Sequence, residues 1–300
     1  MSNKFSLGEF LKLYSGNEKC LEKIRQLRWP DGITCPDCGK VTKFYPIKGR
    51  TTYACEFGGY QLSPLKGTIF EKTTTPLQYW FYAIYLMTQT RSGISAKQLQ
   101  RELGVTYKTA HRMFKLIRTL MVNTDNSFLT GVVEMDETFV GGKAKNRVKL
   151  WNADTDKKEV IFGAVERGGK AYLKHVPNTG KWTLLKQIQD HISPEARVIT
   201  DEYQSYTQLS KFGYKHDWVN HSRWEYVHGD VYTQNIKNIW SHLKRGIYGV
   251  YRHVSKKYLQ AYVDEYAWRY NHRNDVNIFE NLLKQVVEVK FLKTSQIALV

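Results

Sequence analysis

The pattern of apolar and polar residues changes three times along the chain. Short apolar runs and turn residues fill residues 1–75, and apolar positions at helical spacing fill residues 76–125. From residue 128 to residue 275, β-rich segments alternate with amphipathic ones, and residues 276–300 are apolar and basic. We therefore predict a small N-terminal module, a helical domain, a mixed α/β domain, and a C-terminal helix with a tail.

The helical region contains a two-helix pattern with a tight turn. Pro76 opens a first helix, and the stretch SGISAKQLQRELGVTYKTAHRMFKLIRTLM follows, with Gly104 at the turn and Thr106 capping a helix from Tyr107. This spacing favours a helix-turn-helix over an ordinary hairpin with a solvated basic face. The second helix would present to DNA the side chains of Tyr107, Lys108, His111, Arg112 and Lys115.

The α/β region begins with an apolar strand that carries acidic residues, GVVEMDETFVGG. Since alternate residues of a strand point to opposite faces, Glu134 and Asp136 share one face and Glu137 takes the other. Acidic residues within an apolar strand are costly unless they are paired or bind a cation.

The segments that follow this strand predict which strands pair with it in the sheet. EVIFGAVERGG and KAYLKHVPN form a hairpin by pattern, GKWTLLKQIQDHIS reads as a crossover helix, and a short strand then ends on Asp201. This order brings the first and fourth strands together in a ribonuclease-H-like sheet. Ligand groups of α/β folds lie at the carboxyl ends of strands, so Asp136 and Asp201 would share a cation. Trp240, further along, is expected in the core.

The charge of the chain points to a polyanionic partner. The formal net charge is +17, while 42% hydrophobic and 14% aromatic residues indicate a globular chain rather than a basic tail. A basic enzyme or a membrane-surface protein is the alternative. The phosphate backbone would contact Lys143, Lys145 and Arg147 after the first strand, unless this loop is merely solvated, and also Lys244 and Arg245. No apolar run of about 20 residues and no signal-peptide pattern is present, so we expect a cytoplasmic protein.

Three of the four cysteines lie at close spacing. Cys35 and Cys38 form a CxxC knuckle, but the second knuckle reads Cys55-Glu-Phe-Gly58 and lacks its fourth thiolate. The cluster is then a zinc ribbon that lost its metal, a site completed by Glu56 or a distant residue, or a set of buried thiols. Cys20 is too far along the chain to replace the missing ligand.

The order of these parts resembles the DDE transposases of bacterial insertion sequences. The similarity lies in MDETFVGGK, VITDEYQSY, the VNHS-to-VHGD segment, NIWSHLKRG and YVDEYAWRYNHR, which together span nearly the whole chain. The chain is most similar to the subgroup with a zinc ribbon, a helix-turn-helix and an ISXO-like transposase domain of ribonuclease-H fold.

The resemblance implies a catalytic site with two Mg²⁺ or Mn²⁺ ions. Asp136 and Asp201 match the first two acidic residues, while Lys237 occupies the position where many relatives have Glu. Some members use asparagine as the third residue, and the spacing after Asp201 suits Asn238, with Asn235 as the second choice.

The resemblance also implies double-stranded DNA as the partner, both terminal inverted repeats and target, and a homodimer or higher synaptic complex. The protein would work in the bacterial cytoplasm on the nucleoid, without a membrane, and a structural zinc ion would belong to the N-terminal module. Two other interpretations are a catalytically inactive DNA-binding protein of transposon origin and a ribonuclease-H-type nuclease without strand transfer.

Overall fold

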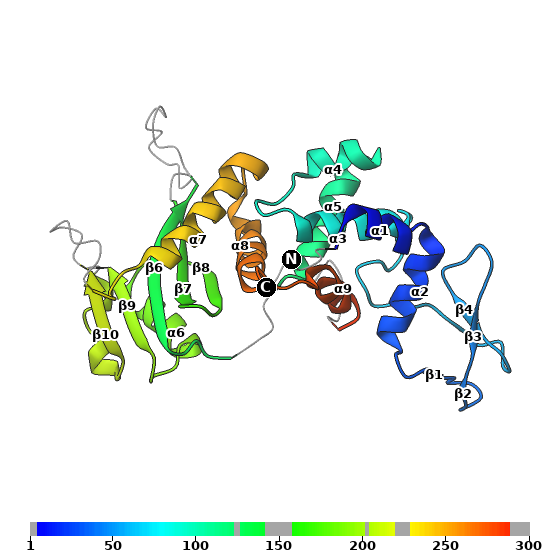
Figure 1. The fold of residues 1–300 in the computed structure, drawn as a ribbon, viewed down its shortest axis with the longest axis horizontal. Helices are drawn as coiled ribbons and strands as arrows, with labels where there is room; N and C mark the ends of the chain where they lie inside the picture. The colour runs from blue at the N-terminus through cyan, green and yellow to red at the C-terminus, as the bar shows by residue number, and fades with distance from the viewer. Residues whose placement is uncertain (1–4, 123–126, 142–157, 202–203, 220–228, 289–300) are drawn as a thin grey trace. The chain divides into compact units, whose positions relative to one another are not determined.

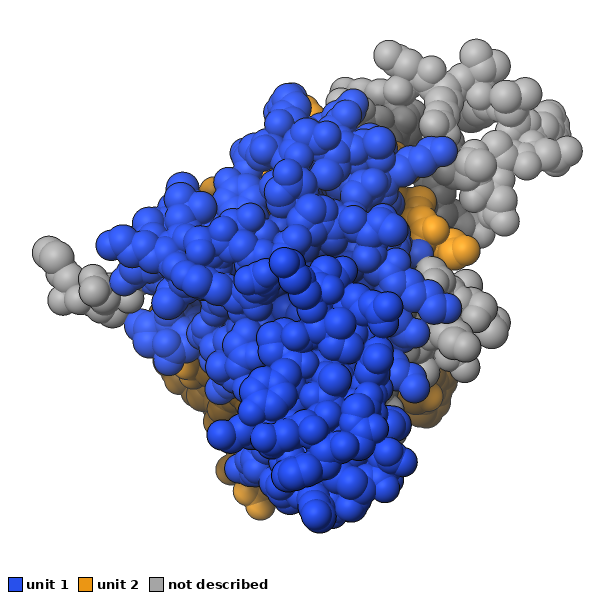
Figure 2. Space-filling model, turned by 90° about the vertical axis from the view of Figure 1, so that its right-hand side faces the viewer, with its two compact units in different colours: residues 1–90, 96–120, 275–300 blue, residues 91–95, 121–274 orange. Residues whose placement is uncertain are grey.

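The computed structural model describes residues 5–122, 127–141, 158–201, 204–219 and 229–288. The chain divides into two compact units, residues 1–90, 96–120 and 275–300 in the first and residues 91–95 and 121–274 in the second (Figure 2). None of the helices in the described ranges is long and apolar enough to cross a membrane. The four-part division expected from the sequence stays a prediction.

The first unit is a helical assembly with an aromatic core. It contains α1 (Leu7–Leu13), α2 (Asn17–Arg28), α3 (Leu77–Gln89) and α9 (Ile278–Glu288). Phe279 of α9 stacks on Phe5 at 5.0 Å between ring centroids, and the Tyr14 hydroxyl donates to Glu280 at 2.9 Å. The C-terminal helix therefore packs with the N-terminal ones, because its apolar side is buried among their aromatic rings.

Two more helices of this unit follow the predicted pattern around Gly104. They are α4 (Ala96–Leu103) and α5 (Tyr107–Thr119). The Thr106 hydroxyl caps α5 by accepting the Thr109 backbone N–H at 3.2 Å. Gly104 has a φ of 64°, which the turn requires and which other residues adopt only with strain.

Small hairpins surround the cysteines. One sheet pairs β1 (Ile33–Thr34) with β2 (Val41–Thr42), and a second joins β3 (Phe44–Pro46), β4 (Tyr53–Cys55) and β5 (Gln61–Leu62), all antiparallel. Cys35 directly follows β1 and Cys55 ends β4. The cysteines therefore lie where hairpin strands turn.

The second unit is built on a five-stranded sheet (Figure 1). The strands are β6 (Val132–Val140), β7 (Glu159–Glu166), β8 (Ala171–Val176), β9 (Arg197–Asp201) and β10 (Lys215–Val219), in the order β10-β9-β6-β7-β8. β6, β7 and β8 are antiparallel, whereas β9 runs parallel to β6 and to β10. This is the ribonuclease-H-like order, and the predicted pairing of the first and fourth strands is confirmed.

Helices cover both faces of this sheet. The buried side chains of α6 (Lys181–His191) pack with Met135 and Phe162 on one face. Those of α7 (Gln234–Arg245) and α8 (Lys256–Asn271) pack with Ile161 and Val165 on the other. Short helical turns complete the unit: η2 (Gln204–Tyr206), η3 (Leu209–Phe212) and η5 (Gly246–Tyr251).

One glycine in the sheet sets how closely α7 approaches. Gly163 of β7 lies opposite Asp136 of β6, and a Cβ at Gly163 would stand 2.4 Å from the indole ring of Trp240. The missing side chain lets the ring of Trp240 lie directly on the strands. The contact therefore places a helix-borne indole beside Asp136.

Candidate functional site: an acidic sheet edge and a cysteine cluster

The acidic site begins where β6 and β9 run side by side. Their parallel pairing sets Glu134 opposite Ile199. Continuing this register by two residues brings Asp136 opposite Asp201, at the carboxyl end of β9. Both side chains are half-buried, so the two carboxylates expected to meet do lie on neighbouring strands.

The carboxyl group of Asp136 is held in a form that resists ionisation. Burial raises the pKa of Asp136 to about 6, and the charge of Asp201 adds to the rise. Two donors act in the opposite direction, the Trp240 indole N–H at 3.0 Å from Oδ2 and the Glu137 backbone N–H at 2.9 Å from Oδ1. A cation placed between Asp136 and Asp201 would relieve their repulsion.

Glu137 belongs to the same acidic group, which the sequence pattern alone did not reveal. Burial raises its pKa to about 8, followed by the charges of Asp136 and Asp201. The Tyr206 hydroxyl donates a hydrogen bond to its carboxylate. Its side chain leaves the strand on the face opposite to Asp136, as the alternation of a strand predicts, yet the charges of both aspartates still act on it.

Three residues of α7, Asn235, Lys237 and Asn238, differ in how they interact with this acidic group. The charge of Lys237 lowers the pKa of Asp136, so its ammonium lies within electrostatic reach of the acidic group. Asn238 follows it and is exposed to solvent. Asn235, one turn earlier, is occupied by hydrogen bonds to Glu134. Of the two asparagines, Asn238 is the one with an exposed carboxamide.

Two residues of this region have roles that sequence reasoning missed. Trp240 is buried, as expected of a core residue, but its indole N–H also binds Asp136. Arg167 comes from the hairpin turn after β7 and pairs with the fully buried Glu134 at 2.8 Å. A tryptophan or arginine carries no local sign of such a partner, because the partner lies far away in sequence.

The second candidate site is the cysteine cluster of the first unit. The ligand atoms of Cys35, Cys38 and Cys55 all lie within 4.8 Å of one another, and the sulfurs of Cys38 and Cys55 are 3.9 Å apart. The backbone N–H of Gly58 holds the pKa of the Cys55 thiol below its usual value. The backbone N–H of Lys40 acts to lower the pKa of the Cys38 thiol, but burial and the neighbouring Cys35 and Cys55 leave it above its usual value. Three clustered sulfur ligands suit a soft divalent cation such as zinc.

The two knuckles share one backbone geometry. Gly39 N–H donates to the Cys35 carbonyl at 2.9 Å, and Gly59 N–H donates to the Cys55 carbonyl at 3.2 Å. Both glycines have positive φ, 68° and 65°. Position 58 therefore corresponds to Cys38, and the second knuckle keeps its form without its second thiol.

An acidic side chain stands beside the missing thiol. A Cβ built on Gly58 would lie 2.9 Å from Oδ2 of Asp37. Glu56, considered from the sequence, is exposed and accepts a long hydrogen bond of 3.4 Å from Thr42. Cys20 is buried in α2 and is not a member of the cluster, and burial raises its pKa to about 12. Asp37 is thus the side chain nearest to a Cβ at position 58, although its carboxylate is not among the ligand atoms that lie within 4.8 Å of one another.

The predicted DNA-contacting residues fall into three groups. On α5, Tyr107, Lys108, His111 and Arg112 are exposed and Lys115 is half-buried. Partial desolvation of the ring, followed by the charges of Arg118 and Lys115, lowers the pKa of His111 although its side chain is largely exposed. On α7, Lys244 is half-buried, and the exposed Arg245 bonds Ser241 at 2.6 Å. Lys143, Lys145 and Arg147 lie outside the described residues.

Solved structures similar to this chain include two Mos1 complexes. The pre-cleavage Mos1 transpososome has a TM-score of 0.25 at 13% identity, covering 74% of this chain and 82% of that one. The Mos1 strand transfer complex has a TM-score of 0.27 at 14% identity, covering 74% and 81%. Scores this low carry no argument, so the fold assignment rests on the strand order described above.

Matches to two family models and to relatives in sequence identify the family of this chain. Residues 128–271 match the ISXO2-like transposase domain, and residues 16–61 match the transposase zinc-ribbon domain. An uncharacterized protein in transposable element ISH50 of Halobacterium salinarum is 25% identical over 86% of this chain and 92% of its own length. An uncharacterized transposase-like protein of Haemophilus influenzae is 31% identical over 40% of this chain and 94% of its own length. The chain therefore belongs to the insertion-sequence transposases that combine a zinc-ribbon domain with an ISXO2-like transposase domain.

Proposed function

We propose that this transposase cuts the ends of its mobile element and joins them to target DNA at the Asp136–Asp201 edge of the sheet. The observation that carries this proposal is the meeting of two carboxylates on β6 and β9, together with the raised pKa of Asp136. Two acidic groups close together at a half-exposed edge, one of them with a raised pKa, favour a cation site over a purely structural role.

The donor set fits hard divalent cations. Carboxylate and amide oxygens are the ligands that Mg²⁺ and Mn²⁺ prefer, and Asp136, Asp201 and Asn238 would hold them. Two such ions supply charge neutralisation and activation of the attacking oxygen in phosphodiester chemistry. The indole of Trp240 orients Asp136 through its hydrogen bond, and the carboxyl of Glu137, whose pKa is raised to about 8, would hold a proton beside the two aspartates at neutral pH.

The reaction has two displacements at phosphorus. Water attacks the phosphodiester at the element's end, and the bond to the 3′ oxygen breaks, leaving a 3′-hydroxyl and a 5′-phosphate. That 3′ oxygen, after losing its proton, attacks a phosphodiester of the target, whose own 3′ oxygen leaves. The number of phosphodiester bonds is unchanged in the second step, so neither an energy source nor a covalent protein–DNA intermediate is required.

We assign DNA binding to α5 and to the end of α7. The exposed Tyr107, Lys108, His111 and Arg112 with Lys115 would enter a groove of the terminal repeats, and Lys244 and Arg245 would contact phosphates near the cut. Lys143, Lys145 and Arg147 are assigned to the same backbone contact. A homodimer or larger complex would hold two ends together, on the nucleoid of a bacterial cytoplasm.

The third metal ligand can be tested on α7. Asn238 is our choice because its carboxamide is exposed, while that of Asn235 is held by Glu134. Asn238→Ala should then weaken Mn²⁺ binding at least tenfold, with Ser241→Ala as the control on the same helix. If Asn238→Ala binds Mn²⁺ normally and Lys237→Glu binds it more tightly than wild type, the ligand position is 237 and the native lysine opposes metal binding.

The N-terminal cluster is proposed as a zinc site of three thiolates with Asp37 as the oxygen ligand. We expect one zinc per chain by metal analysis and a cobalt(II) spectrum with three sulfur ligands. Gly58→Cys should change the spectrum to four sulfur ligands and tighten binding, because the Asp37 carboxylate is the flexible end of a side chain and can move aside. An unchanged spectrum in Asp37→Ala would exclude Asp37 as a ligand.

The decisive experiment is a strand-transfer assay with Mn²⁺, a terminal-repeat substrate and Asp136→Ala as the control. Joined products that the variant loses support transposition. Cleavage without joining would instead indicate a nuclease.

Lys237 beside Asp136 favours one other candidate, an inactive DNA-binding protein derived from a transposon. Tight end binding without any cutting would establish it.

A further inference from the structure

We propose that Glu134 is a positioning residue whose buried carboxylate fixes the start of α7 to β6 and thereby holds the metal-binding residues in register. The inference rests on the proposed metal-dependent function. It assigns to Glu134 neither metal binding nor contact with DNA, because its carboxylate is fully enclosed by protein donors.

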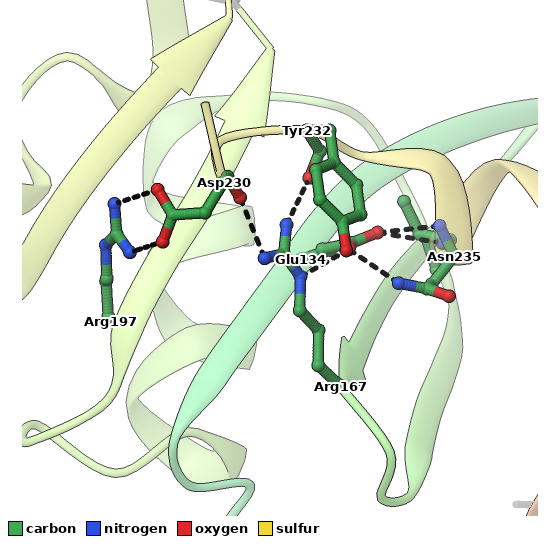
Figure 3. A network of polar contacts seen from close by, with 7 residues as sticks. Glu134, Arg167, Arg197, Asp230, Tyr232 and Asn235 are labelled. Atoms are coloured by element: carbon green, nitrogen blue, oxygen red, sulfur yellow. Dashed lines mark hydrogen bonds and ion pairs between the residues drawn. The ribbon is translucent and has the colours of Figure 1, made fainter. Parts of the chain in front are cut away.

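The carboxylate of Glu134 accepts four hydrogen bonds (Figure 3). Oε2 receives the backbone N–H groups of Asn235 at 2.8 Å and Ile236 at 3.3 Å. Oε1 receives Arg167 Nε and the Asn235 side-chain amide, both at 2.8 Å. Since the N-cap residue Thr233 makes no side-chain capping bond, Glu134 acts as the cap of α7 from another element.

The same network extends to the strand that carries Asp201. Arg167 donates to the carbonyls of Asp230 at 2.8 Å and Tyr232 at 3.0 Å, and its guanidinium lies over the Tyr232 ring. The Asp230 carboxylate binds Arg197 of β9, with 3.2 Å between Nη2 and Oδ1 (Figure 3). The chain of contacts therefore links β6, the segment before α7, and β9.

Each element reached by the network also carries a proposed metal ligand a few residues later. Glu134 precedes Asp136 by two positions on the same face of β6, and Arg197 precedes Asp201 on β9. Asn235 precedes Asn238 by about one turn of α7. Metal sites need their ligands held within about 0.5 Å, so a network that ties these three elements together determines the site without touching it.

The test compares two fully buried carboxylates. Glu134→Gln keeps the size of the side chain but turns an NH₂ group toward Arg167 or Asn235, which are themselves donors. Glu265→Gln is the matched control, because Glu265 is equally buried and accepts bonds from Arg269 at 2.7 Å and Tyr251 at 2.7 Å, but it lies on α8. Both variants lose one buried charge pair of the same kind.

The readouts are Mn²⁺ affinity by electron paramagnetic resonance, hydrogen exchange of the Asn235 and Ile236 amides, and strand transfer. We expect Glu134→Gln to weaken Mn²⁺ binding by about 10- to 100-fold and to speed exchange at both amides. Glu265→Gln should leave the Mn²⁺ affinity and the exchange rates of the two amides unchanged. Arg167→Lys, which keeps the charge but loses the contacts to Asp230 and Tyr232, should weaken Mn²⁺ binding less.

Two outcomes separate this inference from the proposed function. Wild-type protein that binds no Mn²⁺ overturns the function, and the inference with it. If wild type binds Mn²⁺ and Asp136→Ala abolishes binding, but Glu134→Gln binds like wild type, only the positioning role is overturned. If Glu134→Gln does not fold, the Mn²⁺ affinity of Arg167→Lys decides instead. Weakened binding supports the positioning role, and an affinity like that of wild type overturns it.

Discussion

Two carboxylates on one face of β6, those of Glu134 and Asp136, have opposite electrostatic surroundings. Around Glu134, four donors, one of them a guanidinium, enclose the carboxylate completely. Around Asp136, two residues further, the hydrogen bonds among the described residues come from two neutral donors. The charge of Asp201 raises the pKa of Asp136, and the opposing charge of Lys237 has a smaller effect. Two residues along the strand, a fully compensated carboxylate is thus followed by one whose burial and repulsion are only partly compensated.

The contrast separates a carboxylate that stabilises the fold from one that, under the proposed function, binds a cation. A buried carboxylate with enough donors contributes to a single arrangement of its surroundings, and removing it leaves the donors without partners. A carboxylate among like charges destabilises the fold until a cation arrives. Under the proposed function, this penalty at Asp136 would be offset when a metal ion binds.

The largest expected effect is a contrast between two alanine variants. Glu134→Ala should lower the local stability of β6 and β7 by about 3 to 5 kcal/mol, because Arg167 and two helix N–H groups lose their acceptor. Asp136→Ala should change it by no more than about 1 kcal/mol, since the lost indole hydrogen bond is offset by relief of repulsion. Native-state hydrogen exchange of the β6 and β7 amides, without Mg²⁺ or Mn²⁺, measures both. Equal losses in the two variants would remove the distinction.

A smaller effect is expected in the pH dependence of the metal-free protein. The pKa of Asp136 is about 6 in the folded protein and 3.8 in the unfolded chain. The contribution of this group to the free energy of unfolding is therefore fully present below about pH 4 and is lost as the pH rises from 4 through 6. Asp136→Asn should remove this loss and be more stable than wild type above pH 7, by up to about 3 kcal/mol.

Saturating Mn²⁺ provides the control for this pH experiment. It should restore wild-type stability above pH 6 and leave Asp136→Asn unchanged, because the amide no longer carries the charge that the cation neutralises. Parallel pH profiles of the two proteins in the absence of metal would mean that Asp136 does not titrate in this range.

The smallest expected effect concerns the contact that joins the acidic end of β6 to α7. Gly163→Ala places a methyl group against the rigid ring of Trp240 and should destabilise the second unit by about 1 to 2 kcal/mol. Gly249→Ala is the control, because a Cβ there meets no atom within 4 Å. Thermal unfolding followed by tryptophan fluorescence would compare them, and equal melting temperatures would show that Trp240 can move at no cost.

The local elements were predictable because their signals are local. Apolar alternation around Glu134 and Asp136, the glycine turn after Glu166, and the Thr106 cap each act within a few residues, and the observed strands and helices follow them. The placement of α9 against the N-terminal helices was not predictable, since an apolar helix face does not specify its partner. The roles of Arg167, Tyr206 and Trp240 were hidden for the same reason.

By itself the sequence determined the order of elements, the family and the carboxylates that share a strand face, because side-chain periodicity and motif spacing are properties of the chain. Only the tertiary structure decided that Glu134 is neutralised by Arg167 and Asn235 while Asp136 is left beside Asp201 and Glu137. Desolvation and Coulomb energy depend on distances in space, and the partners of Glu134 lie far away in the chain, Arg167 at 33 positions and Asn235 at 101. Two acidic residues with the same pattern therefore acquire different chemistry when the sheet and α7 come together.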